Sequence, residues 1–366
     1  MGVFRVMRPL SSRFRRFAGY AFIALIWSGL AALLAFFGVV FALYSDFKNP
    51  TGSRLTAGTA AEFVGGAIYN WFRSASPSLP DAELVYVPHP GAVRIVAPEY
   101  DVVMTVARDG TRQQPPRETP AAGGLVVVAG DSFTFGLGVQ DHETYAAVLQ
   151  QKFGYATVNT GVISYGTARE LWRLRRMGLL SKADALVIQF CSNDGRENAD
   201  FVRDPSGRFG RDQATQIGVA AEDVRYMAVT YGNVLGATLR YLRGRAAGEG
   251  YWGAIKAIAR SRRASLGAVA RARDRRSGEA LAADFLGVLD QFPELAGKPI
   301  YVLELNDRGG NAGFLEALAQ KVAGRPNVKP VPVRLTEDQF FRFDGHLTPR
   351  GHETVAAALD RALRER

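Results

Sequence analysis

Three short, continuous apolar runs in the last two-thirds of the chain constrain its fold more than any other feature. They lie at residues 125–129, 185–190 and 299–303, and each has the length of a strand rather than of a helix. Weaker runs lie near 156–158 and 328–333, and helix-compatible stretches separate all of them. A continuous apolar strand is buried on both faces, and strands that alternate with helices form a parallel sheet. The sequence therefore predicts an α/β fold with helices on both faces of the sheet.

A second feature is the absence of charged residues between positions 17 and 45. As a helix this run would be about 43 Å long, which exceeds the hydrocarbon core of a bilayer, roughly 30 Å. Five arginines precede it and only Lys48 follows closely, and positive charge favours the cytoplasmic side. We expect a single-pass anchor in the inner (plasma) membrane, with the amino terminus cytoplasmic and the main domain periplasmic or extracellular. A cleaved signal peptide and a buried helix of a soluble domain are the alternatives.

These patterns divide the 366 residues into four parts. An Asp109-Gly110 pair between strand-like residues predicts a hairpin before the main domain, and a Pro- and Gly-rich stretch at 113–124 predicts the linker into it. The main domain is longer than a minimal α/β core, which indicates a helical insert at about 195–297. The expected parts are a basic cytoplasmic tail at 1–16, the transmembrane anchor at 17–45, a juxtamembrane extension with its linker at 46–123, and the main domain at 124–366.

The net charge of +10 is concentrated in two segments, 1–16 and 239–276, and the rest of the chain is net acidic. This distribution, with the expected location outside the cytoplasm, argues against nucleic acid as a partner. Residues 251–276 resemble a basic amphipathic helix pair, which either presents a solvated face or contacts an anionic glycan or lipid headgroups. The single cysteine, Cys191, excludes an intrachain disulfide and a cysteine-rich zinc site.

The motif with the clearest chemistry is Gly-Asp-Ser-Phe-Thr-Phe-Gly at 130–136, directly after the first apolar run. It places Ser132 where a parallel strand ends and a helix begins, so that unpaired N–H groups lie beside the hydroxyl. The alternative is that Ser132 only caps the helix. The motif does not end in Gly-Lys-Ser/Thr as a phosphate-binding loop does, and Ser132 is not framed as G-x-S-x-G.

Polar clusters follow other predicted strands as well. Asn159 to Gly166 follows the second run and contains Gly161, Cys191 to Asp194 follows the third and contains Asn193, and Asp344 to His352 lies near the carboxyl terminus. The carboxyl ends of parallel strands meet at one edge of a sheet, which is where ligands bind in such folds. The sequence therefore predicts one site built from all four clusters.

These four blocks, in this order, resemble those of the SGNH or GDSL-type serine hydrolase superfamily, from Gly130 to the end of the chain. The resemblance implies a flavodoxin-like, three-layer fold with about five parallel strands, and ester hydrolysis through a serine nucleophile. We expect no metal and no cofactor. Carried over by position, Ser132 is the nucleophile, His346 the general base and Asp344 its orienting partner. The oxyanion hole would consist of the N–H groups of Ser132 and Gly161 and the side-chain amide of Asn193.

Two positions depart from the family pattern. Cys191 stands where the third block usually has a glycine, and Phe343 occupies the position of the usual aspartate, three before His346. The resulting D-x-H spacing is similar to that of alginate O-acetylation proteins, which raises an O-acyltransferase alternative. If the segment is extended, Asp344 and His346 face the same side, so that the carboxylate can hold the ring while the ring accepts the serine proton.

Other residues could take these roles. His352 is the alternative base, although it falls one turn into the helix that Thr348 and Pro349 should start, and Ser164 is the alternative nucleophile. Asp131 and Asp194 are expected to brace loops, and no His, Asp or Glu cluster has the spacing of a metal site.

The sequence thus predicts a membrane-tethered serine esterase that acts through an acyl-Ser132 intermediate. Its substrate would be an acylated, for example acetylated, carbohydrate of the cell envelope or exterior, or a lipid. The alternatives are an O-acyltransferase with the same site and a non-catalytic, membrane-anchored binding module. The sequence does not indicate an oligomeric state.

Overall fold

The structure, a computed structural model, describes residues 20–34 except 21 and 32, 78–117 except 98, 124–209 except 208, 277–306, 313–341 and 344–365. The chain divides into two compact units, 1–60 and 61–366. In the first unit, the described residues between 20 and 34 are helical and exposed. No helix in the described part of the chain is both long and apolar enough to cross a bilayer. The tail at 1–16 and the remainder of the expected anchor at 17–45 lie outside the described residues.

The apolar runs form one parallel five-stranded sheet in the order β6-β5-β7-β8-β9. In chain order this is 2-1-3-4-5, the order of flavodoxin-like folds, so the predicted α/β fold class is confirmed. The strands are β5 (Leu125–Ala129), β6 (Ala156–Asn159), β7 (Ala185–Phe190), β8 (Ile300–Glu304) and β9 (Val328–Pro330). Strand β9 is shorter than the predicted run at 328–333, because Pro330 and Pro332 lack the N–H that a ladder needs.

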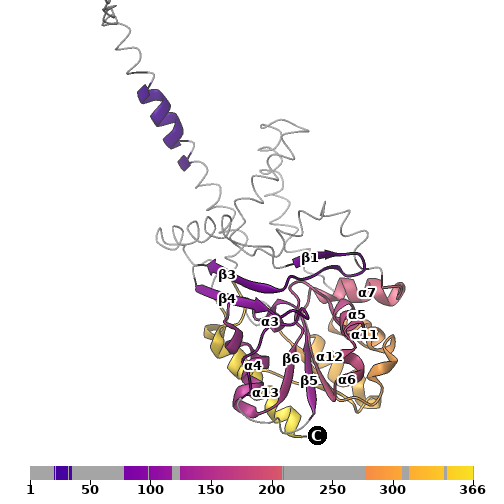
Figure 1. Cartoon of the computed structure of the whole chain (residues 1–366). Coiled ribbons are helices and arrows are strands. Elements are labelled where there is room, and N and C mark those ends of the chain that lie inside the picture. The colour runs from indigo at the N-terminus through magenta and orange to yellow at the C-terminus, as the bar shows by residue number, and fades with distance from the viewer. Residues whose placement is uncertain are drawn as a thin grey trace, which may run out of the picture. The chain divides into compact units, whose positions relative to one another are not determined.

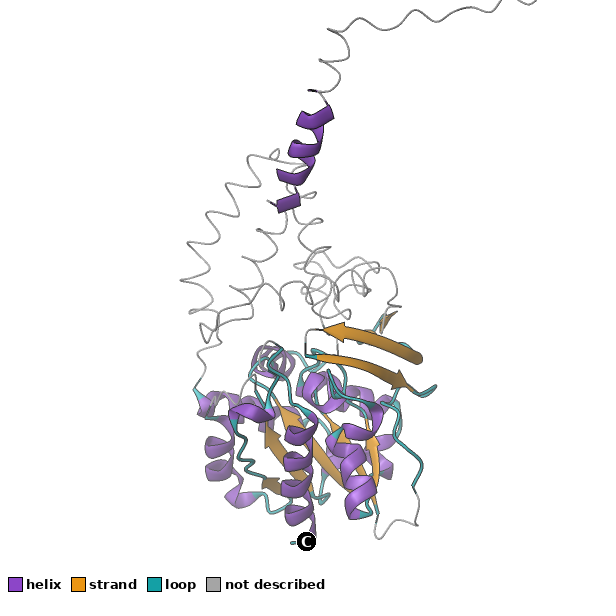
Figure 2. Ribbon diagram, turned by 90° about the vertical axis from the view of Figure 1, so that its left-hand side faces the viewer, coloured by secondary structure: helices purple, strands orange, loops and turns teal. Residues whose placement is uncertain are grey.

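Helices cover both faces of this sheet (Figures 1 and 2). Because neighbouring strand residues point to opposite faces, Val126 and Val128 pack with α4 and α13, whereas Val127 and Ala129 pack with α5, α6, α7, α11 and α12. The helices are α3 (Ser132–Phe135), α4 (Tyr145–Phe153), α5 (Thr167–Arg176), α6 (Leu179–Lys182), α7 (Asp194–Arg203), α11 (Gly278–Asp290), α12 (Phe314–Lys321) and α13 (Pro349–Arg364). Short 3-10 turns are η1 (Asp141–Glu143), η3 (Pro293–Leu295), η5 (Val322–Gly324) and η6 (Glu337–Gln339).

The predicted insert at about 195–297 begins and ends within this helical layer. Phe201 of α7 and Phe285 of α11 are buried in the same apolar cluster as strands β7 and β8. Both ends of the segment are therefore part of the core, because they cover a sheet face that would otherwise be exposed. The basic segment at 251–276 lies outside the described residues.

Two hairpins precede the sheet. Strands β1 (Ser78–Asp81) and β2 (Val85–Pro88) pair antiparallel, as do β3 (Gly91–Ala97) and β4 (Tyr100–Val106). The predicted hairpin at Asp109-Gly110 is confirmed as a tight turn that brings Arg112 back beside Val106. Arg112 also bridges to Asn159 of β6. The extension is therefore packed onto the main domain where the sequence suggested a separate segment.

Candidate active site

The serine lies in a tight turn between β5 and α3. Gly130 has a φ of 156°, and a Cβ at this position would lie 2.0 Å from Thr134 Oγ1, so only glycine fits. Gln189 Oε1 accepts the Asp131 N–H at 3.0 Å, and Asp131 Oδ1 accepts the Phe133 N–H at 2.9 Å. Asp131 rather than Ser132 therefore caps the helix. Because α3 is a single turn, any stabilisation of negative charge at this turn comes from its individual N–H groups rather than from a helix macrodipole.

The histidine lies in a closed loop before α13. Phe340 bridges Leu347, the Phe341 N–H donates to the His346 carbonyl at 2.7 Å, and the Gly345 N–H donates to the Phe341 carbonyl at 2.8 Å. Gly345 has a φ of 84°, which folds the chain back between Asp344 and His346. The extended geometry predicted for the D-x-H segment is therefore wrong, and a turn brings the two side chains together instead.

The three predicted triad side chains form a continuous series of hydrogen bonds. Ser132 Oγ lies 2.7 Å from His346 Nε2, and His346 Nδ1 makes a short hydrogen bond with Asp344 Oδ1. Ser132 is 9% exposed and both partners are 6% exposed, so little water screens their charges. The ring of Phe133 packs against the His346 ring with centroids 4.8 Å apart. The arrangement can therefore move a proton from the serine hydroxyl to an imidazole that a carboxylate orients.

The three predicted oxyanion donors have different surroundings. The Ser132 N–H has no acceptor within the described part of the chain, and Asn193 is exposed at the start of α7, with its side-chain amide equally without a partner there. The Gly161 N–H, in contrast, donates to Asn159 Oδ1 at 3.0 Å. A Cβ on Gly161 would lie 2.3 Å from the Phe135 nitrogen, which places this residue against the back of α3. Gly161 could serve an oxyanion only after leaving Asn159, so its predicted role does not fit this loop conformation.

Buried carboxyl groups lie on the helices that begin beside this edge of the sheet. Glu170 of α5 is 3% exposed and Asp194 of α7 is 1% exposed. Burial raises the pKa of Glu170 well above its ordinary value, and the negative charges of Asp194 and Asp131 raise it further. Burial and Asp131 likewise raise the pKa of Asp194, whose Oδ2 accepts the Thr167 hydroxyl at 3.0 Å. Asp131 and Asp194 thus brace loops, as the sequence suggested.

The two alternative residues, His352 and Ser164, have different surroundings. His352 is fully buried in α13, where its Nδ1 accepts the Tyr145 N–H at 3.2 Å. Burial, then the charges of His346 and Arg112, lowers the pKa of His352 to about 3, so the ring is neutral. Ser164 is an exposed residue with a φ of 63° in the loop after β6.

The third block is braced by a residue that the sequence did not single out. Cys191 is buried, and its Sγ lies 3.3 Å from Asn306 Oδ1, which also accepts the Ser192 N–H at 2.7 Å. No group of three His, Cys, Asp or Glu residues within the described ranges could hold a metal ion.

Sequence reasoning also missed Tyr100 and Glu99, which contact Asp344 from outside the four blocks. The Tyr100 hydroxyl donates to Asp344 Oδ2 at 2.7 Å, and Glu99 Oε2 accepts the Asp344 N–H at 3.0 Å. The available signal was the alternation of β4, in which Tyr100, Val102, Met104 and Val106 lie on one face. An alternating strand has one covered face, which indicated that this hairpin packs on something.

No protein-family model matches the chain, and no curated protein matches it. Solved structures similar to it include a lipase, Lip_vut3, from a goat rumen metagenome, with 15% identity over 66% of this chain and 97% of that one, TM-score 0.36. Another is a lipase/acylhydrolase from Enterococcus faecalis, with 17% identity over 66% and 96% of the two chains, TM-score 0.33. A third is an α/β hydrolase, LAE5, from the metagenome of Lake Arreo in Spain, with 18% identity over 66% and 95%, TM-score 0.33. The chain is thus similar to these structures at low identity.

Proposed function

We propose that this protein is a serine hydrolase that cleaves ester bonds through an acyl-Ser132 intermediate. The observation that carries the proposal is the hydrogen-bonded series from Ser132 Oγ through His346 to Asp344. A serine hydroxyl is a weak nucleophile until a neighbouring base accepts its proton, and an imidazole suits that role near neutral pH. The burial of the three side chains supports the proposal, because electrostatic interactions are stronger away from water.

In the proposed reaction, Ser132 Oγ attacks the ester carbonyl carbon and its proton passes to His346 Nε2. The carbonyl oxygen becomes an anion, which we expect the Ser132 N–H and the Asn193 amide to stabilise; one such donor contributes about 3–4 kcal/mol. His346 then protonates the leaving alkoxide, and the C–O bond of the ester breaks. A water molecule repeats the sequence on the acyl-serine, releasing the acid and restoring the Ser132 hydroxyl.

We propose an acylated, chiefly acetylated, carbohydrate of the cell envelope or exterior as substrate, with an acylated lipid as the alternative. The charge-free run at 17–45, with arginines before it, supports this proposal because it favours a membrane anchor and a site outside the cytoplasm. A reporter fused to the carboxyl terminus would then be active only outside the cytoplasm. Reporter activity in the cytoplasm would contradict this location.

The second candidate function is transfer of the acyl group to a sugar hydroxyl. Two observations favour it: the D-x-H spacing of Asp344 and His346, and the low exposure of Ser132. Water that reaches the acyl-serine slowly would leave time for another acceptor. Release of acetate from acetylated polysaccharide, measured with and without a sugar acceptor, separates the two functions, because a transferase forms an acetylated acceptor at the expense of free acetate.

The proposal is tested with the full-length protein and 4-nitrophenyl acetate. We expect turnover by the wild type, covalent labelling of Ser132 by a fluorophosphonate, and loss of both in Ser132→Ala. Ser164→Ala is the matched control, since it removes a serine from the neighbouring loop and should leave labelling intact. Labelling at Ser164, or full turnover by Ser132→Ala, would refute the proposed nucleophile.

A further inference from the structure

The β3–β4 hairpin lies outside the four blocks, yet it packs against the site (Figure 1). The buried face of β4 forms an apolar cluster with residues that follow Ser132 and with one that precedes His346. Its members are Val93, Ile95, Tyr100, Val102, Met104, Val106, Phe135, Leu137, Val139 and Phe341. The hairpin is therefore a fixed wall of the site.

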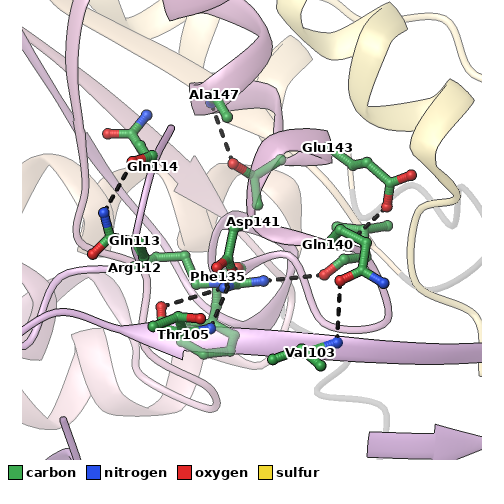
Figure 3. A network of polar contacts seen from close by, with 12 residues as sticks. Val103, Thr105, Arg112, Gln113, Gln114, Phe135, Gln140, Asp141, Glu143 and Ala147 are labelled. Carbon is green, nitrogen blue, oxygen red and sulfur yellow. Dashed lines mark hydrogen bonds and ion pairs between the residues drawn. The ribbon is translucent and has the colours of Figure 1, made fainter. Parts of the chain in front are cut away.

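Polar contacts hold this hairpin against the segment that follows α3 (Figure 3). The Arg112 guanidinium donates to the carbonyls of Phe135 at 3.1 Å and Val139 at 3.0 Å, and forms a short ion pair with Asp141. Burial lowers the pKa of Arg112 to about 9, which is still above neutral pH, so the group is charged. Along β4, the Val103 N–H donates to Gln140 Oε1 at 3.1 Å. These bonds hold β4 against the segment that follows the serine helix.

Tyr100, at the start of β4, extends from this wall to the triad. It is 8% exposed, and its ring packs on Phe341 with centroids 5.0 Å apart. A Cβ on Gly138 would lie 2.9 Å from the Tyr100 ring, so the ring has little room to move. Its hydroxyl donates to Asp344 Oδ2, while Oδ1 of the same carboxylate faces His346 Nδ1. The two oxygens of Asp344 are thereby given different partners.

We infer that Tyr100 is a positioning residue for the reaction, which orients Asp344 through its second oxygen. The inference rests on the proposed function of Ser132, His346 and Asp344. A donor on Oδ2 restricts rotation of the carboxylate about its terminal bond and so helps to fix its plane. The same donor stabilises the carboxylate charge in a buried position, where an unpaired charge is costly. Tyr100 thus keeps the carboxylate aligned with His346 as the ring accepts the serine proton.

The test is Tyr100→Phe in the full-length protein, which removes one oxygen and keeps the ring. Hydrogen bonds to charged groups contribute enough to predict a loss in kcat of about tenfold or more, with KM changed less than twofold. The rate of fluorophosphonate labelling at Ser132 should fall in parallel. In an Asp344→Asn background the same change should have little further effect, because the hydroxyl then has no carboxylate to orient.

Two controls separate positioning from folding. Leu318→Ala opens a cavity beneath α12, in the apolar cluster that does not include β4, and it should lower the melting temperature while kcat stays close to the wild type. Tyr155→Phe removes another tyrosine hydroxyl that donates to a carboxylate, Asp360 Oδ1 at 3.1 Å, and should leave kcat unchanged.

Wild-type kcat and labelling in Tyr100→Phe would overturn the inference. So would an equal loss of kcat in Leu318→Ala, or an undiminished effect of Tyr100→Phe in the Asp344→Asn background. If the wild type itself is not labelled at Ser132, the proposed function fails instead, and the two failures are therefore distinguishable.

Discussion

Glu170 offers a quantitative test of how this fold treats buried charge. Neither of its carboxyl oxygens meets a hydrogen-bond partner in the described part of the chain, and burial holds its pKa well above the ordinary 4.5. Between pH 4.5 and the raised pKa, the folded protein keeps a proton that the unfolded chain has released. Glu170 should therefore lower the free energy of unfolding by up to about 1.4 kcal/mol for each pH unit gained in this window.

Glu170→Gln replaces the protonated carboxyl by an amide of the same shape that does not titrate. The advantage of the variant over the wild type should be smallest at about pH 4.5 and grow, by up to about 1.4 kcal/mol per pH unit, as the pH rises towards the raised pKa of Glu170. Urea unfolding at several pH values measures this difference, provided that the dependence on urea concentration is the same for both proteins.

Glu294→Gln is the control for the sign of the effect. Hydrogen bonds from Arg175 hold the pKa of Glu294 below its ordinary value, so its contribution to stability is present above pH 4.5 and is lost as the pH falls. The free energy of unfolding of Glu294→Gln, relative to the wild type, should not increase as the pH rises from 5 to 7. A difference between Glu170→Gln and wild type that stays constant from pH 5 to pH 7 would show that Glu170 is ionised in the folded protein and refute the reasoning.

The remaining predictions concern the triad, the wall and the neutral histidine. Asp344→Asn should lower kcat by about 10³–10⁴-fold in the 4-nitrophenyl acetate assay, because the ring loses the acceptor that fixes its tautomer; a loss below tenfold would contradict its role. Arg112→Met should lower the free energy of unfolding by about 3 kcal/mol in urea titrations, since it removes the ion pair with Asp141 and the hydrogen bonds to two carbonyls, and an unchanged midpoint would contradict this. His352→Asn should keep esterase activity, unlike His346→Asn. Because protonation of His352, with its pKa of about 3, favours the unfolded chain, this residue lowers stability as the pH drops from 6.5 towards 3; the stability of His352→Asn relative to the wild type should therefore rise as the pH falls through this range.

The sheet was predictable because its strands are buried on both faces. Continuous apolar runs can satisfy that environment, and β5 and β7 begin and end at the predicted residues, 125–129 and 185–190. The proximity of Ser132 to His346 was predictable for a related reason, because the carboxyl ends of parallel strands converge at one edge of the sheet. The insert was harder to delimit, because α7 and α11 have the amphipathic pattern of any helix, and only the sheet face they cover identifies them as core.

The contacts between side chains from distant segments could not be predicted. The hydrogen bond from the Gly161 N–H to Asn159 Oδ1 depends on the conformation of the loop. The turn at Gly345 depends on a left-handed backbone conformation, which the D-x-H spacing does not specify. The bond from Tyr100 to Asp344 joins residues 244 positions apart. Its alternating strand indicated a covered face but not what covers it.

The docking of the β3–β4 hairpin changes where the functional unit begins. A fragment cut at residue 124 would retain Ser132, Asp344 and His346, but it would expose Phe341 to solvent and leave one oxygen of the aspartate without its phenol donor. Such a fragment could keep its parallel sheet and still be a poor enzyme. The smallest autonomous piece worth expressing should therefore start ahead of Ser78, and loss of activity on trimming would locate the amino-terminal limit of the active site.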